Sequence, residues 1–170
     1  GSCFEVRLPC VPSRLPVAPD RALPFQAGDE PGGRRLAGLS VLVAEDNEVN
    51  SMVLEEMLGE EGARVTLAGN GQEAVDAVRR QGGAAFAVVL MDVQMPVMDG
   101  FDATRAIHAL APDLPVIGQT AHALDEERER CFAAGMVDHL AKPIDPERLV
   151  EVVRRHVAGP GGAGGAGRDA

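Results

Sequence analysis

The stretch that decides the fold is AFAVVLMDVQMPVMDGFDATRAI, residues 85–107. It opens with an unbroken apolar run, Ala85 to Met91, which ends at the carboxylate of Asp92. A strand that is apolar on both of its alternating faces is typical of the centre of a parallel sheet covered by helices on both sides. The loop after Asp92 ends in an Asp-Gly pair, and we expect the next helix to begin at Gly100.

The same alternation of a short apolar run and a helical segment repeats between residues 39 and 157. The runs that predict strands are residues 40–44, 64–68, 85–91, 115–117 and 137–141. Strands and helices that alternate at this pitch predict an α/β fold, a doubly wound five-stranded parallel sheet with helices on both faces. In the first helical segment Val49, Met52, Val53 and Met57 recur at helical spacing, which predicts a core-facing stripe. We expect the methionines at positions 52, 57, 91 and 136 to fill the core.

Polar residues follow four of the five predicted strands, at their carboxyl ends: Glu45, Asp46, Asp92, Thr120 and Lys142. Ligand chemistry in open α/β sheets collects at that edge, so we expect these side chains to converge. Three converging carboxylates repel one another, and a hard divalent cation such as Mg²⁺ relieves the repulsion. The alternative is that Glu45 and Asp46 only cap the following helix. Asp92 favours the cation site, because no helix starts directly after it.

An aspartate can also act as a nucleophile that accepts a phosphoryl group. Such a site needs a cation, a hydroxyl donor and a positive side chain, which Thr120 and Lys142 can supply beside Asp92. Lys142 is the single lysine among 16 basic residues, and Pro143 follows it. A lone lysine in an arginine-rich chain favours a role for a compact point charge over a planar fork.

Four segments, in order and at matching intervals between about residues 39 and 156, resemble the phosphoacceptor receiver domains of two-component signalling. They are LVAEDNEVN (42–50), LMDVQMPVMDGFDATRAI (90–107), PVIGQTAHAL (115–124) and ERCFAAGMVDHLAKPID (129–145). The resemblance implies a flavodoxin-like (βα)5 sandwich over residues 38–157. It also implies a signalling function, in which Asp92 takes a phosphoryl group from a phosphohistidine.

Position by position, the resemblance implies that Mg²⁺ is held by Glu45, Asp46, Asp92 and the backbone carbonyl of Gln94. It implies that Thr120 and Lys142 contact the phosphoryl group, and that Thr120 takes part in the switch.

Two positions depart from the pattern of the family. His139 stands three residues before the lysine, where receivers usually carry an aromatic switch residue, and Gln119 replaces an aliphatic residue. His139 is either a switch residue with a titratable ring or a strand residue without a special role. A buried polar side chain at position 119 needs a hydrogen-bond partner. We therefore expect altered coupling between phosphorylation and the output face.

Charge and cysteine content exclude other classes of protein. With 16 Lys and Arg against 26 Asp and Glu, five Phe and no Trp or Tyr, the chain lacks the features of a nucleic-acid binder. The net charge is −10, and the acid is concentrated in residues 38–157. Cys3, Cys10 and Cys131 lack the spacing of a zinc site and fit reduced thiols, so we expect a soluble cytoplasmic segment. No apolar run approaches the ~20 residues of a membrane-spanning helix.

The two ends differ in composition from the centre. Residues 11–37 are rich in Pro and Gly and predict a linker, and the Gly-rich residues 158–170 predict a disordered tail. The segment GSCFEVRLP is similar to the last strand of a histidine kinase ATP-binding domain, so residues 1–10 are expected to be a remnant of one, or a tag. The motifs MDVQMPVMDG, TAHAL and AKPID are most similar to receivers attached to hybrid sensor histidine kinases, whose parent chain can be membrane-anchored.

The resemblance implies two partners, the phosphohistidine domain of a kinase and a histidine phosphotransfer protein, because no DNA-binding segment follows the receiver. Enzymatic activity is expected to be at most self-phosphotransfer and autodephosphorylation, with kinase activity left to the parent chain. A degenerate receiver that only docks is the alternative, and it is disfavoured because every site position is filled. A phosphatase with an aspartate nucleophile would need a general acid where Gln94 stands.

Overall fold

The computed structural model describes residues 34–121 and 125–157. Five parallel strands form one sheet in the order β2-β1-β3-β4-β5, which confirms the predicted fold class. The strands are β1 (Ser40–Ala44), β2 (Arg64–Ala68), β3 (Val88–Asp92), β4 (Val116–Thr120) and β5 (Asp138–Ala141). The predicted kinase remnant, most of the predicted linker and the predicted tail lie outside the described residues.

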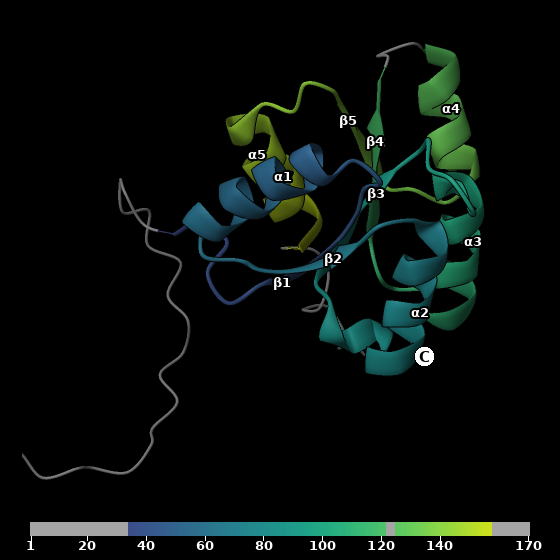
Figure 1. The fold of residues 1–170 in the computed structure, drawn as a ribbon, viewed down its shortest axis with the longest axis horizontal. Helices are drawn as coiled ribbons and strands as arrows, with labels where there is room; N and C mark the ends of the chain where they lie inside the picture. Colours follow the sequence, from purple (N-terminus) through teal and green to yellow (C-terminus); the bar gives the residue numbers. More distant parts are fainter. Residues whose placement is uncertain (1–33, 122–124, 158–170) are drawn as a thin grey trace, which may run out of the picture. The chain divides into compact units, whose positions relative to one another are not determined.

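Helices cover both faces of the sheet (Figure 1). They are α1 (Glu48–Glu60), α2 (Gly71–Gln81), α3 (Gly100–Leu110), α4 (Asp125–Ala133) and α5 (Pro146–Val157), with a short 3-10 helix η1 (Gly83–Ala85). One core cluster lies on the face of α1 and α5 and includes Leu90, Ile117 and Leu149. The other lies under α2, α3 and α4 and includes Val89 and Ile107. Alternate residues of a strand therefore reach different cores, as the pleat requires.

The predicted strand boundaries are wrong at three of the five runs. Ala85 ends η1 instead of opening β3, because apolar composition alone does not separate a strand from a short helical turn after Gly82 and Gly83. The fourth strand is longer than predicted and runs through Gly118 and Gln119 to Thr120. The fifth begins one residue late, at Asp138. The extra residues of β4 carry the sheet to the edge where the polar residues lie.

The predicted buried stripe of α1 is wrong. Val49 and Met52 are each 67% exposed and Val53 is 42% exposed, whereas Leu54 and Leu58 are the buried residues of the helix. Leu54 and Leu58 are four residues apart and share one face, and this face orients α1 towards the sheet. Met52 is therefore not core, Met57 is only partly buried, and the methionines at 91 and 136 are buried as expected. A row of apolar side chains is left on the outside of the helix.

Residues just before β1 already belong to the packed structure. Leu36 is fully buried in the core under α1 and α5. Arg35 pairs with Glu61, at the end of α1, and its Nη1 lies 2.6 Å from Oε2 of Glu147 in the first turn of α5. The domain start at residue 38 stays a prediction, although Leu36 packs as part of the core.

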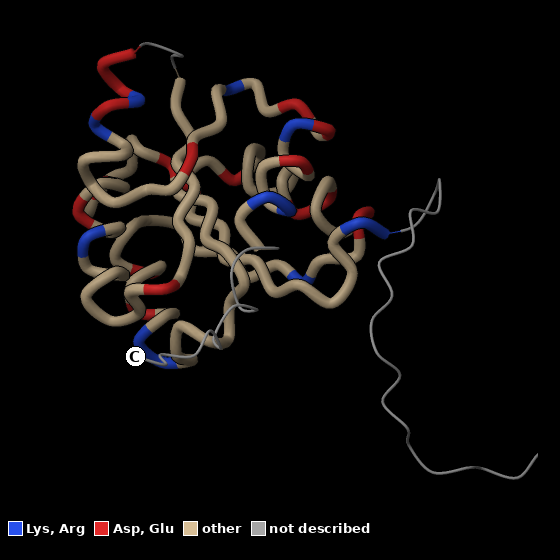
Figure 2. Tube along the Cα trace, turned by 180° about the vertical axis from the view of Figure 1, so that it is seen from behind, with Lys and Arg blue, Asp and Glu red and all other residues tan. Residues whose placement is uncertain are grey.

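Charged positions lie mainly on the helices and at strand ends of the described chain (Figure 2). Three of them, Asp125, Glu126 and Glu127, form the first turn of α4, where negative charge suits the helix dipole. None of the helices that the structure describes has the length and apolar content needed to cross a membrane.

Candidate functional site

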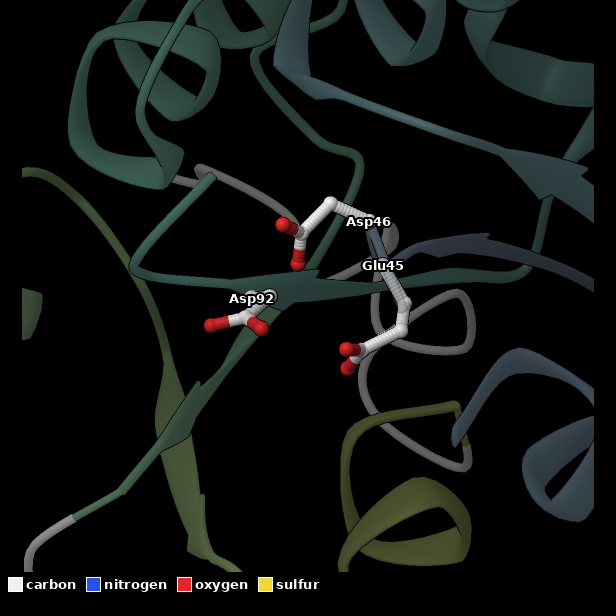
Figure 3. A group of neighbouring side chains, drawn as sticks. All are labelled: Glu45, Asp46 and Asp92. Atoms are coloured by element: carbon white, nitrogen blue, oxygen red, sulfur yellow. The ribbon is translucent and has the colours of Figure 1, made fainter. Parts of the chain in front are cut away.

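The carboxylates of Glu45, Asp46 and Asp92 converge at the carboxyl edge of the sheet. Glu45 and Asp46 directly follow β1, and Asp92 is the last residue of the neighbouring strand β3. One oxygen from each carboxylate lies within 4.8 Å of the others, and Figure 3 shows the three side chains around one point. The strand order reverses between β1 and β3, which is where open α/β sheets place their ligand sites.

Lys142 reaches into this acidic group from the end of β5. Its Nζ donates to Oδ2 of Asp92 at 2.6 Å and to Oε2 of Glu45 at 2.7 Å. Although burial acts to lower it, the pKa of Lys142 is raised by its hydrogen bonds to the two carboxylates. The ammonium is therefore charged at neutral pH and offsets part of the negative charge of the group.

Asp92 is buried at the carboxyl end of β3. Its side chain is only 9% exposed, and Oδ1 accepts a hydrogen bond of 3.0 Å from the backbone N–H of Gln94. Burial raises the pKa of the Asp92 carboxyl above its ordinary value, against the opposing effects of Lys142 and the Gln94 N–H. A Cβ at position 100 would lie 2.2 Å from the carbonyl oxygen of Asp92, so only glycine lets α3 begin this close to β3.

The helix-cap alternative for Glu45 and Asp46 does not hold. The N-cap of α1 is Asn47, whose side chain accepts from the backbone N–H groups of Val49 and Asn50. Glu45 is buried, and its second oxygen, Oε1, accepts from Nδ2 of Asn50 at 3.0 Å. Its carboxylate is therefore held in place from α1 as well as by Lys142.

Asp46 is exposed and lines a cleft of about 380 Å³ together with Gln94. The oxygen donors that converge here are the buried carboxylates of Glu45 and Asp92 and the exposed carboxylate of Asp46, which opens onto this cleft. Oxygen donors with room for water are what Mg²⁺ requires, so these residues fit that cation. Among the described residues this is the single group of three acidic, His or Cys side chains close enough to hold a metal ion.

Thr120 and Lys142 meet at the edge of the sheet as the sequence predicts. Thr120 is buried and ends β4, and its carbonyl oxygen accepts from the backbone N–H of Lys142 at 2.8 Å. The structure therefore brings together Glu45, Asp46, Asp92, Gln94, Thr120 and Lys142. His139 is the second residue of β5, and its ring meets that of Phe132 edge-on at 6.4 Å between centroids. Its role in switching stays a prediction.

Gln119 is fully buried beside this site, and its side chain lacks the partner that a buried amide needs. It pairs with Asp92 on one side and with Leu140 on the other. Neither Nε2 nor Oε1 of the side chain has a hydrogen-bond partner. The sequence marked this position as unusual, but only the strand register shows that it adjoins Asp92.

Replacing Gln119 by methionine should stabilise the free protein. A buried amide without partners costs roughly 1–3 kcal/mol, and methionine fills a similar volume without polar atoms. We expect the free energy of unfolding in urea, measured without divalent cations, to rise by about 1 kcal/mol or more. A loss of stability would show that the amide is already satisfied in the free protein.

Asp138 anchors a second polar cluster, which the sequence did not predict. It accepts from the backbone N–H of His139 at 2.8 Å and lies 3.2 Å from Nη1 of Arg155 and 3.1 Å from Nε2 of His156. Although burial acts to raise it, the pKa of Asp138 is lowered by the His139 N–H, His156 and Arg155. The sequence does not reveal this cluster, because Asp138 lies in β5 whereas Arg155 and His156 lie in the last turn of α5.

The Asp138 cluster should stabilise the fold at neutral pH and lose this effect in acid. A carboxyl whose pKa is lower in the folded state stabilises the fold above its unfolded pKa of about 3.9 and loses this effect as pH falls through the folded value. Asp138→Asn should therefore be less stable than the wild type at pH 7, and the difference should shrink below about pH 4. Urea unfolding at a series of pH values measures this, and a difference that stays constant down to pH 2 would contradict it.

The α/β sandwich, with its acidic cluster and lysine at the strand ends, defines a receiver-type domain. The chain belongs to the response regulator receiver domain family, whose model matches residues 41–154.

The most similar relatives include sensor kinases and isolated receivers. The chain is 42% identical over 118 residues to the sensor protein GacS of Pseudomonas syringae pv. syringae, covering 66% of this chain and 13% of that protein. The receiver domain of the sensor histidine kinase PA1611 from Pseudomonas aeruginosa PAO1, solved with magnesium in its active-site cleft, is 42% identical. The match covers 72% of this chain and all of the PA1611 receiver chain, with a TM-score of 0.67.

A third similarity concerns the fold alone. The Saccharomyces cerevisiae receiver of Ssk1, solved with the histidine phosphotransfer protein Ypd1, is 24% identical, with a TM-score of 0.66. The match covers 72% of this chain and 91% of that one. Because the chain spans only 13% of the length of GacS, the similarity concerns the receiver region of such kinases.

Proposed function

We propose that this receiver takes a phosphoryl group from a phosphohistidine onto Asp92 in a Mg²⁺-dependent phosphorelay, as the cytoplasmic receiver of a hybrid histidine kinase. The observation that carries the proposal is the pair of hydrogen bonds from Lys142 to Asp92 and Glu45, beside the third carboxylate of Asp46. A buried aspartate held by a single ammonium at a strand end is a suitable phosphoryl acceptor.

In the proposed transfer, an oxygen of Asp92 attacks phosphorus and forms an acyl phosphate. The bond from phosphorus to the donor imidazole nitrogen breaks, and its electron pair returns to that nitrogen. Lys142 and the Thr120 hydroxyl would donate to the phosphoryl oxygens. Glu45, Asp46, Asp92 and the Gln94 carbonyl would hold Mg²⁺, which would offset the negative charge of the incoming group.

A protein donor must also dock beside the site. The exposed apolar residues Val49, Met52 and Val53, here the α1 patch, begin two residues after the α1 N-cap, Asn47, and three after Asp46. Apolar side chains that gather next to a functional site mark an interaction surface. We infer that the α1 patch receives the histidine-bearing partner, a histidine phosphotransfer protein or the kinase domain that carries the phosphohistidine.

Met52→Glu should slow transfer from a protein donor far more than from a small one. Met52 is 67% exposed, so the folded state should tolerate the charge, while an apolar partner surface would have to desolvate it. With phosphorylated Ypd1 as donor, we expect the rate of transfer to fall about tenfold or more, by the cost of burying an unpaired polar group. Phosphorylation by acetyl phosphate should change little. Equal effects on both donors would contradict a docking role for the α1 patch.

Phosphorylation by acetyl phosphate tests the proposed function itself. The 170-residue chain is incubated with Mg²⁺ and acetyl phosphate, and its intact mass is recorded. We expect a mass increase of one phosphoryl group that depends on Mg²⁺. No adduct at saturating donor would support the docking-only alternative, and repeated turnover of an unrelated phosphoester would support a phosphatase.

A further inference from the structure

Gln119 shares a face of the sheet with both Asp92 and Lys142. Leu90 and Ile117 both belong to the core under α1 and α5, so the residues two positions further along β3 and β4, Asp92 and Gln119, point to that same face. Leu140, the β5 partner of Gln119, belongs to this core too, and Lys142 follows it by two residues. The amide thus lies one cross-strand position from the carboxylate that Lys142 binds.

A cavity separates these side chains from α1. It has a volume of about 200 Å³ and is lined by Gln119, Lys142 and Glu45, with Leu54 of α1 and Ile144 opposite. Buried side-chain polar atoms without a partner occur on three side chains of the described part of the chain, and of these only Gln119 lines this cavity. The cavity therefore holds an unused acceptor, Oε1, beside a lysine with room to move.

Lys142 cannot keep its present contacts unchanged when a divalent cation binds. Its Nζ donates to Glu45 and Asp92, the carboxylates that fit the cation. The bound cation repels the positively charged ammonium of Lys142. The cation and the ammonium also compete for the same carboxylate oxygens. An ammonium has three N–H donors and no acceptor, so a displaced Lys142 needs another oxygen.

We propose that Gln119 is a positioning residue whose Oε1 accepts a hydrogen bond from Nζ of Lys142 while the carboxylates hold the cation. When the phosphoryl group arrives on Asp92, Lys142 turns back to a phosphoryl oxygen and leaves the amide. This inference rests on the proposed function, because it assigns Lys142 a second position within the same site. It also gives a role to a buried polar side chain of β4 that has no hydrogen-bond partner in the free protein.

The single lysine of the chain makes this position directly observable. The 170-residue chain labelled with ¹⁵N at the lysine side chain gives one lysine ammonium signal, from Lys142. Labelled glutamine gives five side-chain amide signals, and the one from Gln119 is assigned by its loss in Gln119→Met. Mg²⁺ is titrated without any phosphodonor, and its Kd is measured by these signals and by calorimetry. The variants are Gln119→Met and, as a control that lines the same cavity without a hydrogen-bonding group, Met57→Leu.

In the wild type, we expect the Lys142 ammonium and the Gln119 amide signals to shift together as Mg²⁺ binds. In Gln119→Met, the Kd for Mg²⁺ should rise about tenfold, as for the loss of a hydrogen bond to a charged group, and the ammonium signal should broaden through exchange with water. Met57→Leu should bind like the wild type. Weaker cation binding in a variant whose unfolding shows it to be more stable is a combination that a purely structural role does not produce.

Two results would overturn the inference while leaving the proposed function intact. One is a Gln119→Met variant that binds Mg²⁺ within about twofold of the wild type, against the tenfold expected for a charge-assisted hydrogen bond. The other is a wild-type Gln119 amide signal that Mg²⁺ does not move. A wild-type chain that neither binds Mg²⁺ nor gains a phosphoryl group from acetyl phosphate would instead remove the proposed function, and the inference with it.

Discussion

Asp92→Asn should abolish the Mg²⁺-dependent phosphoryl adduct. The amide of asparagine is a poor nucleophile and carries no charge for the cation, although it matches aspartate in shape. We expect the adduct formed with acetyl phosphate to fall by more than about 10²-fold, to below detection in an intact mass spectrum. Burial raises the pKa of Asp92, so removing its charge should not unfold the protein.

Asp102→Asn is the matched control for this experiment. Asp102 lies in the same stretch of sequence and its carboxylate pairs on the surface with Arg105 at 2.6 Å. The same chemical change at this position should leave the adduct unchanged. An adduct that survives in Asp92→Asn, or is lost in both variants, would contradict the assignment of Asp92.

Lys142→Arg should be nearly as damaging, although it keeps the positive charge. The Lys142 ammonium fits between Oδ2 of Asp92 and Oε2 of Glu45, at 2.6 and 2.7 Å. A guanidinium is wider and binds carboxylates through two parallel hydrogen bonds, so it would hold Asp92 or Glu45 against both the cation and the phosphoryl group. We expect the rate of phosphorylation by acetyl phosphate to fall by about 10²-fold, as for the loss of one transition-state donor.

Comparison with Lys142→Ala separates charge from shape. Alanine removes the ammonium and leaves two buried carboxylates without a cation, so it should also slow phosphorylation and lower stability at neutral pH. Arginine should preserve stability and lose the reaction. If Lys142→Arg reacted within a few-fold of the wild type, a compact point charge would not be required at this position.

The residues of the site could be predicted from the sequence because they lie at the carboxyl ends of predicted strands. Glu45, Asp92 and Lys142 each follow an apolar run, and in a parallel sheet the ends of neighbouring runs meet. The fold class was predictable for the same reason, since alternation of strand and helix admits few topologies. Boundaries were less predictable, because η1 and the start of β3 are both apolar.

The buried face of α1, the unpaired amide of Gln119 and the Asp138 cluster could not be predicted, because they depend on tertiary packing and not on a local sequence pattern. Helical spacing identified an apolar stripe on α1, but which stripe faces the sheet is set by Leu54 and Leu58 and the position of the helix on the sheet. Gln119 was recognised as unusual, yet its place beside Asp92 follows from the register of β4 against β3, and its lack of a hydrogen-bond partner follows from the packing around it. The Asp138 cluster joins residues far apart in sequence.

The most direct test is to locate the phosphoryl group in the wild-type chain. After reaction with Mg²⁺ and acetyl phosphate, borohydride reduces an acyl phosphate to an alcohol, and peptide mass spectrometry identifies the residue that carried it. The expected result is reduction at Asp92 alone, and none when Mg²⁺ is removed by a chelator. Reduction at Asp46 or Glu45, a phosphoryl group on a histidine, or an equal yield without Mg²⁺ would contradict the assignment of Asp92 as a Mg²⁺-dependent phosphoryl acceptor.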